Sequence, residues 1–357
     1  MKQLLFLLLA FATSSAFGQS EQLVVTGTVI DSATGQPLAG ASVFCQNTTF
    51  GTISKSDGAF ALYLPAGGYD LVISYTSYET RILRIHGPAA ATLSIVLKPK
   101  DKSLEEVAVT GSAMVADGYS KYGQFFFDHF VGTSPNALQC SIQNPEVLQF
   151  YFYKKRNRLK VKATDDLVIV NNALGYKIKF QLDTFAYEYS TDISTYTGFP
   201  FFEELPANDS LKAVWKENRE NAYAGSRLHF VRSWYDSTLA DEGFVIERVD
   251  SASKTLKTYP IDDPYDSSMY RVVENNDVEI NYNGRMRIIF KNAQPDPQYL
   301  RSNHLPNTLH SQISIIDIDD GFIIQQNGYF YDQNDVTNAG YWSWQKLGDV
   351  LPYDYNP

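Results

Sequence analysis

Short alternations of apolar and polar residues, separated by turn residues, run through residues 22–98 and restrict what this part of the chain can fold into. Phe60, Leu62 and Leu64 occupy every second position, as in a strand with one buried face. Turn residues such as Asp57 and Gly58 return about every 8–12 positions, a spacing typical of small all-β domains. We therefore predict about seven strands arranged as a β-sandwich.

Three stretches of this region resemble a known family. They are GTVIDSATGQPLAGASV (27–43), SDGAF (56–60) and YDLVISYTSYET (69–80), and they resemble the carboxypeptidase regulatory-like domain, a transthyretin-like Greek-key sandwich. The next segment, SLEEVAVTG (103–111), is similar to the segment that follows this sandwich in TonB-dependent outer-membrane transporters. Residues 112–357 lack the repeated alternation of about ten residues that a transporter barrel requires, so the transporter resemblance ends at this segment.

Residues 1–18 have the features of a secretory signal peptide. Lys2 gives a positive start, residues 4–12 are continuously apolar, and small residues precede a predicted cleavage before Gln19. No later run reaches the roughly 18 apolar residues of a membrane-spanning helix. The sequence therefore predicts an exported protein without a transmembrane helix.

Charge and cysteine content exclude several classes of protein. The formal net charge of −10 argues against nucleic-acid binding, which needs a basic face. Two cysteines, Cys45 and Cys140, are too few for a disulfide scaffold or a four-cysteine zinc site. Export would permit a disulfide between them, and the sequence leaves this pairing open.

Residues 99–118 are predicted to be a linker, and residues 119–357 a larger α+β domain with antiparallel sheet. A bulge is expected near Asp183, where the alternation over 176–189 shifts by one residue, and Ser210 is the expected N-cap of a helical stretch that Gly225 interrupts. The predicted elements are a helix at 119–132, a hairpin at 147–162, a long strand at 176–189, helix at 210–239, and strands at 244–248, 278–282, 286–290, 312–316 and 322–326.

Four further stretches resemble a group of exported Gram-negative proteins that share the carboxypeptidase-like regulatory domain. They are NPEVLQFYFY (144–153), LGYKIKFQL (174–182), NRENAYAGSRLHFVRSWY (218–235) and GYWSWQKLGDVLPYDY (340–355). The resemblance implies a location in the cell envelope and transfers no catalytic residue.

A search for catalytic and metal-binding motifs gives no site. A carboxypeptidase zinc site needs a His with a Glu three positions later, and none of the five histidines, His86, His129, His229, His304 and His310, has one. The acidic stretch 317–320 is one residue short of a calcium loop, so a hairpin turn at Asp320 and Gly321 is the preferred interpretation. No catalytic residue, metal ligand or cofactor is predicted.

Two clusters are candidates for surface contacts. Six basic residues at the predicted hairpin tip belong either to a solvated hairpin or to a contact with anionic lipid or another envelope polyanion: Lys154, Lys155, Arg156, Arg158, Lys160 and Lys162. Tyr341, Trp342 and Trp344 could stack on a sugar ring, although docking of these aromatics onto the core is the preferred interpretation.

The leading functional hypothesis is a non-enzymatic envelope protein in the periplasm or on the periplasmic face of the outer membrane. The sandwich would be an interaction or folding module, and the second domain would bind an envelope protein or a glycan, with peripheral contact to the outer membrane. The alternatives are a carbohydrate-binding protein and a hydrolase that uses scattered carboxylates such as Glu203, Glu204 and Asp236.

Overall fold

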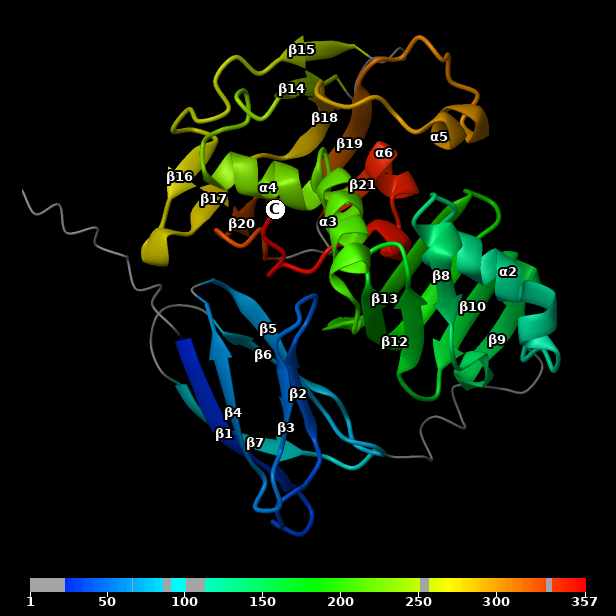
Figure 1. Ribbon diagram of the computed structural model, residues 1–357, viewed down its shortest axis with the longest axis vertical. Helices are drawn as coiled ribbons and strands as arrows, with labels where there is room; N and C mark the ends of the chain where they lie inside the picture. The colour runs from blue at the N-terminus through cyan, green and yellow to red at the C-terminus, as the bar shows by residue number, and fades with distance from the viewer. Residues whose placement is uncertain (1–22, 66, 86–90, 101–112, 251–256, 332–335) are drawn as a thin grey trace, which may run out of the picture.

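The chain folds into a mainly β structure, with an N-terminal sandwich below a larger region of sheets and helices (Figure 1). The computed structural model describes residues 23–65, 67–85, 91–100, 113–250, 257–331 and 336–357. The predicted signal peptide and most of the predicted linker lie outside these residues. Within the described ranges, no helix is both long and apolar enough to cross a membrane.

The sandwich is built from two sheets, as predicted, with strand orders β4-β1-β7 and β3-β2-β5-β6. Phe60, Leu62 and Leu64 all point inward from β4, and Asp57 and Gly58 form the turn that precedes it. The strands are Leu23–Asp31 (β1), Ser42–Cys45 (β2), Gly51–Ile53 (β3), Ala59–Leu64 (β4), Tyr69–Ser74 (β5), Arg81–Ile85 (β6) and Ala91–Leu97 (β7).

A second antiparallel sheet, here called the central sheet, follows the order β8-β11-β12-β10-β9, with β13 along the other edge of β12. Its strands are Cys140–Ile142 (β8), Leu148–Tyr153 (β9), Arg158–Ala163 (β10), Leu167–Asn171 (β11), Tyr176–Glu188 (β12) and Ile193–Glu204 (β13). The predicted hairpin is the β9–β10 pair. The predicted bulge is confirmed by a register shift between Leu182 and Thr184 in β12.

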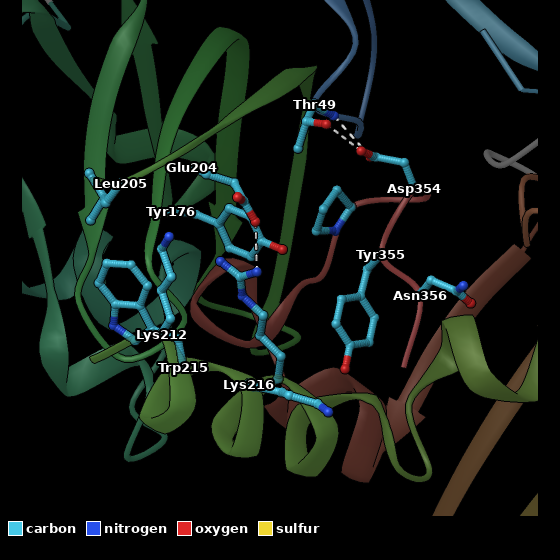
Figure 2. Close-up of a pocket in the computed structure, with 12 residues that line it drawn as sticks. Thr49, Tyr176, Glu204, Leu205, Lys212, Trp215, Lys216, Asp354, Tyr355 and Asn356 are labelled. Carbon is cyan, nitrogen blue, oxygen red and sulfur yellow. Dashed lines mark hydrogen bonds and ion pairs between the residues drawn. The ribbon is translucent and has the colours of Figure 1, made fainter. Parts of the chain in front are cut away.

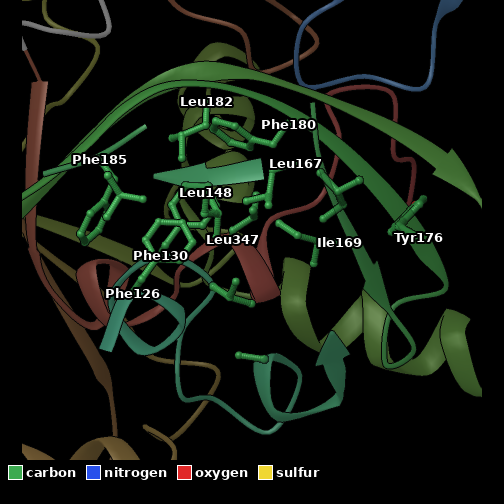
Figure 3. Close-up of a cluster of buried hydrophobic side chains, with 14 of the residues drawn as sticks. Phe126, Phe130, Leu148, Leu167, Ile169, Tyr176, Phe180, Leu182, Phe185 and Leu347 are labelled. Atoms are coloured by element: carbon green, nitrogen blue, oxygen red, sulfur yellow. The ribbon is translucent and has the colours of Figure 1, made fainter. Parts of the chain in front are cut away.

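One face of the central sheet is covered by helix α2, Gly118–Phe130. Phe126 and Phe130 are fully buried and stack at 5.0 Å between ring centroids (Figure 3). Phe126 also packs edge-on against Phe185 of β12 at 5.1 Å. Offset and edge-on ring pairs of this kind add stability beyond their buried area, so this aromatic cluster fixes α2 on the sheet.

The predicted helical stretch is two helices, α3 (Asp209–Tyr223) and α4 (Arg227–Tyr235). The predicted break is confirmed, because Gly225 adopts a φ of 74° between them. The predicted N-cap is wrong by two residues: the side chain of Asn208 accepts the hydrogen bond from Leu211 N at 2.9 Å, and Ser210 lies inside the first turn. Both residue types cap helices well, so sequence alone did not separate them.

Two more antiparallel sheets surround α4: the outer sheet, β15-β14-β18-β19-β21, and a small sheet, β16-β17-β20. The strands are Phe244–Val249 (β14), Thr258–Pro260 (β15), Tyr270–Val272 (β16), Val278–Ile280 (β17), Gly284–Phe290 (β18), Gln312–Ile318 (β19), Phe322–Ile324 (β20) and Val336–Gly340 (β21). The hairpin predicted at Asp320 and Gly321 is wrong, because β19 and β20 belong to different sheets and do not pair.

The C-terminal segment, residues 341–355, joins the two cores of the second region. Trp342 packs with the core around α4, whereas Leu347 and Leu351 pack with the core of the central sheet. Two short helices complete the region, α5 at Pro297–Ser302 and α6 at Tyr341–Trp344. The C-terminal segment therefore holds the central and outer sheets in one arrangement.

Candidate ligand pocket at the domain junction

The sandwich contacts the second region through the loop between β2 and β3. Asn47 N donates to Pro200 O at 2.6 Å, and Phe202 N donates to Thr48 O at 3.0 Å. Thr48 and Phe201 form a parallel β-bridge, so the loop pairs with the end of β13 like a short added strand. The rings of Phe44 and Phe201 pack beside this bridge at 5.2 Å.

The same loop also binds the C-terminal segment. Tyr353 N donates to Asn47 O at 2.7 Å, and Thr49 N donates to Asp354 Oδ1 at 2.9 Å. The Thr49 hydroxyl donates to the second oxygen of the same carboxylate. A backbone loop of the sandwich is thus held from two sides, by β13 and by the C-terminal segment.

A pocket of about 400 Å³ opens at this junction (Figure 2). Figure 2 shows Lys212, Trp215 and Lys216 of α3 on one side of it and the C-terminal segment on the other. The lining residues come from all the parts that meet here: Thr49, Tyr176, Glu204, Leu205, Lys212, Trp215, Lys216, Arg219, Pro352, Asp354, Tyr355 and Asn356. Its volume falls within the range of small-molecule sites.

Arg219 is the centre of the pocket's polar contacts. Its guanidinium pairs with Glu204 at 2.8 Å, donates to Leu174 O at 2.7 Å, and lies 4.0 Å above the ring centre of Tyr176. Burial raises the pKa of the Tyr176 hydroxyl, so this ring stays neutral at ordinary pH. The nearby Trp215 indole donates to Asn172 O at 2.8 Å, which fixes α3 against the sheet.

The pocket has two carboxylates and three cations, and several of them are already engaged. Glu204 is paired with Arg219, and Asp354 is held by Thr49. Lys212 and Lys216 are exposed on α3, with Lys216 within 3.6 Å of the carboxylate of Glu220. The arrangement offers aromatic surface and two exposed ammonium groups, which suits a polar or acidic ligand.

The predicted basic cluster lies elsewhere, at the tip of the β9–β10 hairpin. Lys154, Lys155 and Arg156 form an exposed turn of 3-10 helix. Arg158 pairs with Glu188 at 2.8 Å. Burial, with Lys162 and Arg158 nearby, lowers the pKa of Lys160. The structure therefore brings the six residues together on one hairpin, outside the junction pocket.

The predicted stacking aromatics do not form an exposed platform. Tyr341 and Trp342 are buried, with Tyr341 edge-on to Tyr299 at 5.0 Å and the Trp342 indole donating to Gly225 O at 2.7 Å. Trp344 is half-buried and packs against Tyr299 at 5.8 Å. The sugar-stacking alternative needs free ring faces, which the two buried rings lack because they anchor the C-terminal segment.

The scattered carboxylates of the hydrolase alternative are not assembled in one site. Glu203 is held by Lys177 at 3.1 Å and Lys179 at 2.6 Å. Glu204 is its neighbour on β13 and points to the opposite face of the sheet. Asp236 caps the distant end of α4. The strand alternation alone keeps the first two carboxylates apart.

His229 lies on α4 and is packed in the protein interior. It is buried, its Nε2 lies 3.1 Å from Glu242 Oε2, and Gly225 N donates to its Nδ1 at 3.1 Å. Burial lowers its pKa, which favours the neutral ring. Within the described ranges, no group of three or more His, Cys, Asp or Glu side chains could hold a metal ion.

Cys45 and Cys140 are both free thiols, so the pairing that the sequence left open is absent. Cys45 is buried inside the sandwich and Cys140 lies half-buried at the start of β8. Burial raises the pKa of Cys140 to about 12, which keeps it a poor nucleophile.

The residues of the junction pocket were missed by sequence reasoning. Lys212, Lys216 and Arg219 share one side of α3 at helical spacing, and this periodicity was the one available signal. Nothing local connects them to Thr49 or to Asp354, which approach them through the fold.

The sandwich matches a known domain. Residues 25–109 fit the family model of the CarboxypepD_reg-like domain, as the resemblance predicted. The N-terminal region is similar to two TonB-dependent receptors: SusC of Bacteroides thetaiotaomicron, 38% identical over 117 residues, and P39 of Formosa agariphila, 34% identical over 105 residues. These matches cover 32% and 29% of this chain but 11% and 10% of the receptors, so the chain spans about a tenth of their length.

Among solved structures, the chain has a partial likeness to a putative membrane-associated protein of unknown function from Bacteroides fragilis. The identity is 13% and the TM-score 0.19, with 45% of this chain and 65% of that chain covered. A DUF3823 family protein from Bacteroides ovatus gives 12% identity and a TM-score of 0.18, covering 52% of this chain and 82% of the other. Scores at this level support no conclusion about the second region.

Proposed function

We propose that this protein is a non-enzymatic component of a bacterial cell envelope, in which the sandwich is a fixed structural module and the second region binds a ligand or partner at the junction pocket. The observation that carries the proposal is the double attachment of loop 47–49. Its backbone pairs with β13 on one side and with residues 353–354 on the other, so the sandwich supplies one wall of the pocket.

The envelope location is supported by two independent features. Residues 1–18 have the pattern of a signal peptide, and the sandwich is similar to the N-terminal regions of TonB-dependent receptors. A soluble module on the periplasmic face of the outer membrane would satisfy both. The exposed lysines and arginine at the β9–β10 tip suit contact with anionic headgroups there.

The absence of catalysis is supported by how the pocket carboxylates are used. Glu204 is neutralised by Arg219, and Asp354 accepts hydrogen bonds from Thr49. Each carboxylate therefore links two walls of the pocket, which is a structural role and the one that a binding site needs.

Location is tested by fractionating the native host and sequencing the N-terminus of the protein. We expect an envelope fraction that begins at Gln19. Recovery of intact Met1 in the cytoplasm would contradict the proposed location.

Binding at the pocket is tested with the photo-crosslinker p-benzoylphenylalanine in place of Lys216, in the native host. The control position is Tyr63, which is 62% exposed on the sandwich and outside the pocket. We expect a discrete crosslinked product at Lys216 and none at Tyr63. Equal labelling at both positions would show that the pocket is an ordinary surface.

The absence of catalysis is tested with peptide, ester and glycoside panels, with and without added zinc. We expect no turnover above background. Turnover that disappears in Glu204→Gln would overturn the non-enzymatic assignment.

A further inference from the structure

A second and larger cavity, of about 690 Å³, lies between the central and outer sheets. It shares no lining residue with the junction pocket. Residues 192–197 of the β12–β13 turn and β13 line one side, and residues 336–339 of β21 line the other. Both strands are at the edge of their sheets, since β13 pairs with β12 and β21 pairs with β19 among the described strands. The cavity is therefore flanked by two sheet edges.

The orientation of the β13 edge follows from the contacts of loop 47–48. Pro200 O and Phe202 N are used by this loop, so the backbone groups of these residues point away from β12. Backbone orientation alternates along a strand, and therefore Ser194, Tyr196 and Gly198 present their N–H and C=O groups to the same edge. No backbone hydrogen bond to this edge occurs at 194–198 within the described residues.

Two cations, Arg227 and Lys346, line the same cavity. Arg227 lies over the ring of Phe330 at 5.4 Å, and Lys346 is half-buried, with its pKa lowered by burial. Neither has an ion-pair partner within 4.0 Å in the part of the chain that the structure describes. Two carboxylates lie on the same walls: one oxygen of Asp349 accepts from Asn136 at 3.0 Å, and Asp192 accepts from the Tyr187 hydroxyl.

We propose that this cavity binds an extended acidic peptide segment of a partner protein, which adds a strand to the free edge of β13 and places its carboxylates near Arg227 and Lys346. Main-chain hydrogen bonds would give the affinity, as in other cases of strand addition, and the two cations would select acidic sequences. The edge from residue 194 to 198 accommodates about five residues of a strand, at roughly 3.4 Å per residue.

The chain itself shows that this edge accepts an added strand. Loop 47–48 pairs with residues 200–202 in parallel orientation, and the open part of the edge continues from there toward residue 194. The peptide would thus extend a pairing that the sandwich has already begun. Asn47 takes part in this pairing and also lines the cavity.

The experiment uses the full-length mature protein and a fluorescein-labelled peptide of alternating threonine and valine followed by two glutamates, with binding read by fluorescence polarisation. Ser194→Pro removes one outward N–H, which an edge strand tolerates, and should weaken binding about fivefold. Arg227→Gln and Lys346→Gln should each weaken it about tenfold. The matched controls are Ser194→Ala and Lys154→Gln, which should leave binding unchanged.

Two modified peptides separate the parts of the proposal and do not depend on how the variants fold. A peptide with alternate amides N-methylated should lose binding, because it cannot pair with the edge. A peptide with lysines in place of the glutamates should bind at least tenfold more weakly. Equal binding of the N-methylated peptide, equal binding of the lysine peptide, or no binding of the parent peptide at millimolar concentration would each overturn the proposal. Any of these results leaves the junction pocket, which is tested at Lys216, unaffected.

Discussion

Arg232 holds the C-terminal segment, and replacing it is the sharpest test of how this segment is anchored. The guanidinium donates to Tyr353 O at 2.9 Å, Tyr355 O at 2.9 Å and Asn327 O at 3.1 Å. The substitution Arg232→Met keeps most of the side-chain volume and removes all three donors. We expect residues 353–355 to detach from α4 more often, while the rest of the fold stays intact.

The expected magnitude follows from the three hydrogen bonds. A hydrogen bond to a charged group contributes about 1.5–3 kcal/mol. The side chain of Arg232 is half-buried, so water replaces part of this contribution, and we expect a total loss of about 3–5 kcal/mol from the three bonds. At about 1.36 kcal/mol per factor of ten, this loss makes local opening roughly 150 to 5,000 times more frequent.

Hydrogen–deuterium exchange measures this opening directly. The reporter is the amide of Tyr353, which donates to Asn47 O in the native state. We expect its exchange to become at least about a hundredfold faster in Arg232→Met. The control is Arg301→Met, because Arg301 is exposed and has no side-chain hydrogen bond among the described residues. An acceleration below tenfold would refute the view that Arg232 anchors the segment.

Three further predictions address stability. In a fragment of residues 19–102, which we expect to fold alone, Leu62→Ala should cost about 2–5 kcal/mol of stability because Leu62 is buried. Tyr63→Ala, at the exposed next position, should change stability by less than about 0.5 kcal/mol. Thermal melts in which the two variants lose equal stability would refute the strand register. Burial raises the pKa of Asp349 to about 6 from 3.8, so the folded state binds the proton more tightly and loses stability as the pH rises from about 4 to 6. Asp349→Asn should remove this loss and be up to about 3 kcal/mol more stable than the wild type at pH 7. Urea unfolding of both proteins at pH 4 and pH 7 measures the difference, and equal pH profiles of variant and wild type would contradict the prediction. Gly175→Ala should destabilise by more than about 1 kcal/mol, because Gly175 has a φ of 71° and an added Cβ would lie 2.2 Å from a buried tryptophan; an unchanged melting temperature would count against this packing.

The parts of the fold that sequence predicted well are those set by local periodicity. The alternation at Phe60, Leu62 and Leu64 gave the buried face of β4. The one-residue shift near Asp183 located the bulge in β12, because a bulge changes the face of every later side chain. Both are properties of neighbouring residues, which the sequence shows directly.

Strand β13 was missed because it lacks such a pattern. Only Phe202 of its twelve residues is buried, so no face of it alternates with buried positions, and Pro200 within it argues against a strand. The structure tolerates this proline because β13 is an edge strand and the missing N–H would point away from β12. The Pro200 carbonyl, on the same side, accepts a hydrogen bond from Asn47 N. The exception arises from a contact made 153 positions away in the chain, which no local pattern reports.

The junction pocket could not be predicted for the same reason. Its walls come from loop 47–49, from β12 and β13, from α3 and from the C-terminal segment. The N-cap of α3 shows how far local rules reach. These rules predicted a capping residue at Ser210, two positions from the observed cap at Asn208. They could not show that Thr49 and Asp354 meet, since this depends on the packing of all the elements between them.

The bond between Thr49 and Asp354 also imposes an order in time. These residues are 305 positions apart, so the residues of the sandwich are made long before the segment that clamps loop 47–49. At about 5–20 residues per second of synthesis, roughly 15–60 s separate the two events. Until that segment is present, loop 47–49 can contact residues 200–202 but lacks its second support. An exported chain folds after it has crossed the inner membrane, so a protein with the proposed location passes through this half-supported state outside the cytoplasm. A chaperone that shields strand edges would then act on it there, just before residues 353–355 arrive.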